Sequence, residues 1–167
     1  MGDVVVIKGV WHKGKTISEV ADILTEGDFI LKGANALDLA RRQAAILVGN
    51  PNGGTIIKAI QASIGKRVGL ILPVGLEKRV PGDLNELATI INFPGGTGLR
   101  LMPVAGEVFT EIEAIALLTG AKTELIGSGG VCGAEGAYWL AISGTAQQEG
   151  KAEQLLKSIA AEPPFML

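Results

Sequence analysis

Short apolar runs that end at glycine recur along this chain and constrain its fold more than any other feature. Val4–Ile7 is followed by Gly9, and Ala44–Val48 is followed by Gly49. Runs of this length, rich in β-branched and aliphatic residues and bounded by turn residues, are typical of buried strands. The same pattern predicts further strands at Phe29–Leu31, Val68–Val74, Leu99–Met102, Thr123–Ile126 and Tyr138–Ile142.

Capping residues and apolar stripes predict helices between many of these runs. Thr16 with Glu19 and Thr110 with Glu113 form capping boxes, in which a hydroxyl and a carboxylate satisfy free backbone N–H groups. Further helices are predicted after caps at Thr55 and Asp83, and over Gln147–Ile159.

Alternation of strands and helices favours right-handed crossovers, and therefore a mainly parallel sheet with helices on both faces. We accordingly expect a three-layer, Rossmann-like α/β fold. A length of 167 residues suits one core, so we expect a single α/β domain over residues 1–160 and an extended tail over 161–167.

Composition narrows the classes of partner. The net charge is −2, and no dense basic run is present, so we expect no nucleic-acid partner. Charged residues or glycine interrupt every apolar stretch before membrane-spanning length, so we expect no membrane partner. One cysteine, Cys132, and a start without a signal-peptide pattern predict a cytoplasmic protein. High Ala and Gly content with little net charge also favours a homo-oligomer.

Four glycine-rich turns are the main indication of function, because ligands of open α/β sheets gather beyond the carboxyl ends of strands. The turns lie at Gly33, Gly49–Gly54, Gly95–Gly98 and Gly127–Gly136. Glycine allows close approach of backbone N–H groups, and a helix start adds positive charge. Tight connection without ligand binding is the alternative. The predicted anion-binding residues in these turns are Gly33, Gly53, Gly54, Thr55, Gly129 and Gly130.

Residues 28–80 resemble part of the superfamily of sugar-phosphate isomerases, initiation-factor-2B-like proteins and CoA-transferase-like proteins. The resemblance rests on Gly33–Ala36, Gly53–Thr55 and Pro73–Lys78. In that group such turns line a pocket for a phosphorylated sugar or an acyl-CoA, and the resemblance implies this role for Asn35 and for Gly53–Thr55. A CoA ester is therefore one candidate ligand. The isomerases usually have a catalytic Asp where this chain has Asn35.

Several ionisable side chains are candidates for binding or chemistry. Lys32 and Lys78 each follow a predicted strand, where an ammonium group can neutralise a ligand anion, although exposed surface lysines are common. Glu135 lies among glycines, where burial would raise its pKa and suit it to acid, base or nucleophilic catalysis. Its other role is to accept backbone N–H bonds within the loop. A single His and a single Cys argue against a metal site.

These features predict a protein that binds a small anionic metabolite. One hypothesis is an enzyme of acyl-CoA or sugar-phosphate chemistry with Glu135 as the catalytic residue. The alternative is a non-catalytic metabolite sensor or an accessory, oligomeric subunit. Neither a dinucleotide fingerprint nor a P-loop pattern is present, so P-loop nucleotide hydrolysis is not indicated and the sequence identifies no cofactor.

Overall fold

The computed structural model describes residues 3–163, and the chain divides into two compact units. The first unit comprises Met1–Val74 and Lys78–Val108, and the second comprises Gly75–Glu77 and Phe109–Leu167. Residues 161–163 follow the last helix, and the remainder of the predicted tail, residues 164–167, lies outside the described residues.

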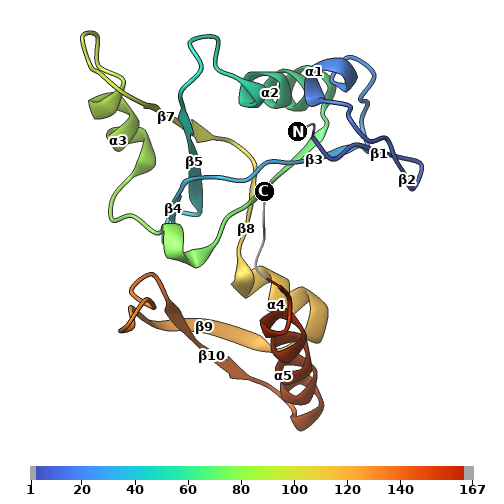
Figure 1. Cartoon of the computed structure of the whole chain (residues 1–167), viewed down its shortest axis with the longest axis vertical. Coiled ribbons are helices and arrows are strands. Elements are labelled where there is room, and N and C mark those ends of the chain that lie inside the picture. Colours follow the sequence, from blue (N-terminus) through green and yellow to red (C-terminus); the bar gives the residue numbers. More distant parts are fainter. Residues whose placement is uncertain (1–2, 164–167) are drawn as a thin grey trace. The chain divides into compact units, whose positions relative to one another are not determined.

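The first unit contains short strands interspersed with three helices among its described residues (Figure 1). Its strands are β1 (Val6–Ile7), β2 (Val10–Trp11), β3 (Phe29–Leu31), β4 (Ala36–Asp38), β5 (Gln43–Val48), β6 (Gly69–Pro73), β7 (Arg100–Val104) and β8 (Glu107–Phe109), whose last residue belongs to the second unit. Its helices are α1 (Ile17–Val20), α2 (Thr55–Lys66) and α3 (Leu84–Ile91), and a 3-10 turn, η1, spans Leu76–Lys78 at the unit boundary.

These strands form separate small sheets. β1 and β2 make an antiparallel hairpin, and β4, β5 and β7 form a three-stranded antiparallel sheet. β3 pairs in parallel with β6, which lies between β3 and β8 in another three-stranded sheet. Parallel pairing requires a long crossover, and the segment between β3 and β6 provides one that includes α2.

The predicted three-layer, Rossmann-like fold is therefore wrong. The described strands form sheets of only two or three strands, and most of the pairings are antiparallel. The physical reason is the length and content of the connections. No helix separates β4 from β5, or β9 (Lys122–Ser128) from β10 (Tyr138–Ser143), and strands joined directly by a loop pair as antiparallel hairpins.

The core of the first unit is made of small and aliphatic side chains. α3 packs against the β4–β5–β7 sheet, and α2 contacts both α1 and β6. The side chains of Leu37, Ile56, Leu72 and Leu84 are completely or almost completely buried. The buried cluster under α3 consists of Ala36, Ala45, Leu84, Ala88 and Leu101.

The second unit places two helices beside a β-hairpin (Figure 1). It comprises α4 (Glu111–Thr119), β9 (Lys122–Ser128), β10 (Tyr138–Ser143) and α5 (Ala146–Ala160). β9 and β10 are antiparallel. Ile115 and Ala152 bury their side chains against Leu140 and Ile142 of β10.

Capping boxes fix the starts of helices, as the sequence predicted. In α4 the Thr110 N–H donates to the Glu113 carboxylate at 2.8 Å, and the Thr110 hydroxyl accepts from the Ile112 N–H at 3.2 Å. In α1 the Thr16 N–H donates to Glu19 at 2.8 Å. Both predicted boxes are confirmed.

Candidate functional site

A cavity of about 610 Å³ in the first unit is the candidate site. Its volume lies within the range of roughly 300–1,000 Å³ that is usual for small-molecule pockets. Three of the residues predicted to bind a ligand line it, namely Lys32, Gly33 and Thr55. The rest of the lining consists of Asp3, Val4, Val5, Val6, Ile17, Val20, Leu24, Phe29, Ile30 and Leu31.

Lys32 and Gly33 directly follow strand β3 and line this cavity. Its parallel pairing with β6 continues one residue beyond the strand, where the Lys32 N–H donates to the Ile71 carbonyl at 2.9 Å. The backbone at Lys32 is thereby fixed, and its half-buried side chain lines the cavity. Lys32 forms no ion pair with any residue between 3 and 163, so its ammonium charge is not neutralised there.

The turn before α2 places Thr55. The Gly53 N–H donates to the Asn50 carbonyl at 3.0 Å, and Gly53 and Gly54 both have positive φ, +79° and +66°. A Cβ on Gly53 would collide with the Ile57 side chain, so the turn requires glycine there. Gly53 and Gly54 do not line the cavity, but their conformation sets the position at which the helix begins.

The start of α2 favours an anion. Gly54 occupies the N-cap position, and no side chain caps the helix by a hydrogen bond. The first N–H groups of a helix lack partners within it, and the helix dipole adds partial positive charge at the same end. Thr55, the first helical residue, lines the cavity, so this end of α2 and Lys32 contribute to the same site.

Asp3 is the one carboxylate among the lining residues of the described chain, and it already has a partner. Its Oδ2 accepts a hydrogen bond from the Ile17 N–H, at the start of α1, at 2.7 Å. This bond attaches the segment before β1 to α1 and so holds Val4–Val6 as one wall of the cavity.

The other walls are apolar and open to solvent. Val4, Val6, Phe29 and Leu31 line the cavity, yet each exposes more than half of its surface, with Leu31 at 68%. Apolar side chains are usually exposed singly, and a group of them around a cavity marks a binding surface.

Asn35 and Lys78, also predicted to bind the ligand, do not line this cavity. The Asn35 side-chain oxygen accepts a hydrogen bond from the Leu47 N–H at 3.0 Å, and its own N–H donates to the Ala45 carbonyl at 2.8 Å. Both bonds connect the start of β4 to β5. Lys78 is half-buried at the end of η1.

Glu135, Gly129 and Gly130 lie in the loop between β9 and β10, in the second unit. Glu135 is exposed and accepts a hydrogen bond from the Gly133 N–H at 3.2 Å. The backbone N–H groups of Glu135 itself and of Gly133 lower the pKa of this carboxyl group. The expected rise in its pKa is therefore wrong, because the side chain is solvated and bonded to backbone rather than buried.

The Gly129 backbone also has a local role in that loop. Its N–H donates to the Ala137 carbonyl at 2.7 Å, and its carbonyl accepts from the Trp139 indole N–H at 3.0 Å. These bonds close the end of the hairpin. Gly95–Gly98, another of the glycine-rich turns, connects α3 to β7 and does not line the cavity.

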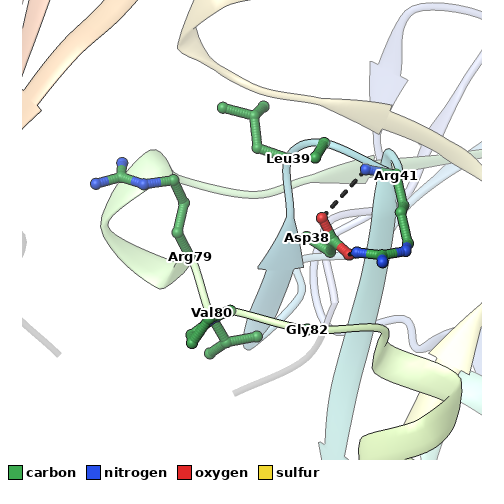
Figure 2. A pocket seen from close by; sticks show the side chains of 8 residues that line it. Asp38, Leu39, Arg41, Arg79, Val80 and Gly82 are labelled. Carbon is green, nitrogen blue, oxygen red and sulfur yellow. Dashed lines mark hydrogen bonds and ion pairs between the residues drawn. The ribbon is translucent and has the colours of Figure 1, made fainter.

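A second hollow, of about 470 Å³, surrounds Asp38, a residue that the sequence did not identify as part of a strand. Figure 2 shows Asp38 and Arg41 facing one another and the Arg79 guanidinium directed away from them. Asp38 accepts from the Arg41 N–H at 3.1 Å and from Arg41 Nη1 at 2.9 Å. The Arg41 backbone N–H, more than its side chain, holds the pKa of Asp38 below its usual value, despite the opposing effect of burial.

This second hollow is a weaker candidate than the cavity at Lys32. The Arg41 guanidinium pairs with Asp38 and lies 3.8 Å from Asp83, so its charge is already balanced.

Among residues 3–163, no group of three or more His, Cys, Asp or Glu side chains is placed to hold a metal ion. Across the same residues, every helix is too short or too polar to cross a bilayer.

Comparisons with protein-family models, with curated proteins and with solved structures found no match to this chain. The geometry of the cavity is therefore the basis for assigning a function.

Proposed function

We propose that the first unit binds a small organic anion in the cavity lined by Lys32, Gly33 and Thr55. The observation that carries the proposal is that the Lys32 ammonium group, which has no ion-pair partner among residues 3–163, lines the same cavity as Thr55 at the start of α2, where no side chain caps the helix. Charge-assisted hydrogen bonds from an ammonium group and from helix N–H groups are strong ligands for carboxylate and phosphate.

We further propose binding without catalysis at this cavity. Its described lining contains neither a His nor a Cys, and its carboxylate, Asp3, is bonded to the Ile17 N–H. A general base must reach the proton that it removes, and the described lining offers one carboxylate, with one oxygen engaged by the Ile17 N–H, and no imidazole or thiol. A sensor or an accessory subunit fits this lining better than an acyl-transfer or isomerase enzyme.

Calorimetric titration of the full chain tests the proposal, with inorganic phosphate, glucose 6-phosphate, hexanoate and hexanoyl-CoA as probes. We expect at least one probe to bind, and Lys32→Met to weaken that binding by about tenfold, the effect of losing one charge-assisted hydrogen bond. Lys13→Met is the matched control, because Lys13 is an exposed lysine of the same unit outside the cavity.

Thr55→Val removes the hydroxyl at nearly constant volume and is expected to weaken binding by about three- to tenfold. Equal losses in Lys32→Met and Lys13→Met would show that only net charge matters and would contradict the site. Absence of binding by all four probes would contradict the proposed function.

A further inference from the structure

We infer that the ligand of this cavity carries a hydrocarbon chain next to its anionic group. The inference rests on the proposed function and names the class of ligand. Aliphatic and aromatic side chains make up most of the lining, and they come from three separate segments: Val4–Val6, Ile17–Leu24 and Phe29–Leu31. Contributions from three segments form an extended, solvent-open apolar surface rather than a single apolar contact.

The size of the cavity exceeds what an inorganic anion fills. Its volume is about 610 Å³, whereas one water molecule in the liquid takes up roughly 30 Å³. An anionic group held at Lys32 and Thr55 therefore leaves most of the cavity for the remainder of the ligand. Apart from Asp3 and Lys32, the described side chains that line the cavity are uncharged, and Val6, Leu24 and Leu31 are among them.

The polar side chains of the lining are too few to recognise a sugar. Hydroxyl groups that lose water on binding need hydrogen-bond partners, and leaving them without partners is unfavourable. Asp3 is already bonded to the Ile17 N–H, and Lys32 and Thr55 are assigned to the anionic group. A chain of methylene groups has no such requirement and gains from leaving water.

The experiment is a calorimetric titration of the full chain with acetate, butyrate, hexanoate and octanoate, with glucose 6-phosphate and inorganic phosphate in parallel. We expect affinity to rise with chain length by up to about fourfold for each added methylene, the effect of transferring that group from water to an apolar surface. The heat-capacity change should become more negative along the series, because more apolar surface is buried.

Two variants locate the effect. Leu31→Ser removes an apolar side chain from the lining, and its exposure of 68% makes it tolerable to the fold. It is expected to reduce the gain in affinity per added methylene. Ile126→Ser is the matched control, because Ile126 is also an exposed strand residue, at 67%, and belongs to the second unit.

The outcomes separate this inference from the proposed function. Suppose that glucose 6-phosphate or phosphate binds through Lys32 and that all four carboxylates bind with equal affinity. That result would contradict the inferred hydrocarbon chain of the ligand but would be consistent with the proposed anion site. Equal losses of chain-length dependence in Leu31→Ser and Ile126→Ser would also contradict the hydrocarbon chain. Binding of no anion at all would remove both.

Discussion

The side-chain oxygen of Asn35 accepts a hydrogen bond from the backbone N–H of Leu47 at 3.0 Å. The bond lies where β4 begins, and it extends the connection between β4 and β5 by one residue. Asn35 therefore stabilises a sheet, although its place in a Gly-Ala-Asn turn suggests ligand binding.

Replacement of Asn35 tests this structural role. Asn35→Ala should lower the free energy of unfolding by about 1 kcal/mol, the usual net contribution of one such hydrogen bond, and should leave anion affinity unchanged. Urea denaturation and calorimetric titration measure the two quantities. In Asn35→Asp an oxygen acceptor remains, so less stability should be lost. A loss of anion affinity without a loss of stability would indicate that Asn35 contributes to ligand binding rather than to the sheet.

Replacement of Gly53 should destabilise the first unit for a conformational reason. Gly53→Ala forces a Cβ onto a residue at φ +79° and against Ile57, so it should destabilise the first unit by about 1–2 kcal/mol or more. It should also weaken anion binding, because the start of α2 moves. Thermal denaturation and titration provide the readouts.

Gly65 provides the matched control on the same helix. It lies near the end of α2, and a Cβ there would meet open space. Gly65→Ala should raise stability by about 0.5–1 kcal/mol, because alanine loses less backbone freedom than glycine in a helix. Destabilisation of similar size in both variants would contradict the special role of the turn at Gly53.

Asp38 should make stability depend on pH in the acid range. Its pKa is lowered in the folded chain, so its contribution is fully present above the pKa of an unfolded aspartate, about 4, and is lost as pH falls through the lower folded value. Asp38→Asn should therefore lose less stability than the wild type between about pH 5 and the acid limit of folding. Urea denaturation over this pH range measures the free energy of unfolding of both proteins. Parallel curves of that free energy against pH would contradict the role of Asp38.

Asp3 should oppose anion binding while it supports the cavity wall. Asp3→Asn retains an oxygen that can accept from the Ile17 N–H and removes the negative charge from the lining. Hexanoate affinity should rise by roughly two- to fivefold, the scale of one partly exposed charge interaction. Glu26→Gln removes an exposed charge outside the lining and should have less effect. An equal rise in both variants would indicate an effect of net charge alone.

Local sequence determined the positions of most elements, and pairing did not follow from it. Phe29–Leu31 was predicted as a strand with the bounds it has in the structure. β4 was not among the predicted strands, because its three residues include Asp38 and no glycine marks the turn that follows. Arg42 adopts a positive φ of +53° in that turn, and this conformation is uncommon for arginine, so the sequence did not predict it.

Only the polar residues of the candidate site were predictable from the sequence. A lysine at a strand end and a threonine after a glycine pair indicated Lys32 and Thr55, but their common cavity depends on the parallel pairing of β3 with β6. The apolar wall was missed, because Val4–Ile7 has the pattern of one buried strand. Only Val6–Ile7 is a strand, and Val4 is 78% exposed.

Amide chemical-shift mapping of the full chain, in separate titrations with hexanoate and glucose 6-phosphate, tests the anion site most directly. We expect the tighter-binding probe to shift the amide signals of Lys32, Gly33, Thr55 and Ile56, and Lys32→Met to suppress those shifts. Shifts confined to the loop Gly127–Gly136, where Glu135 lies, would contradict the proposed anion site.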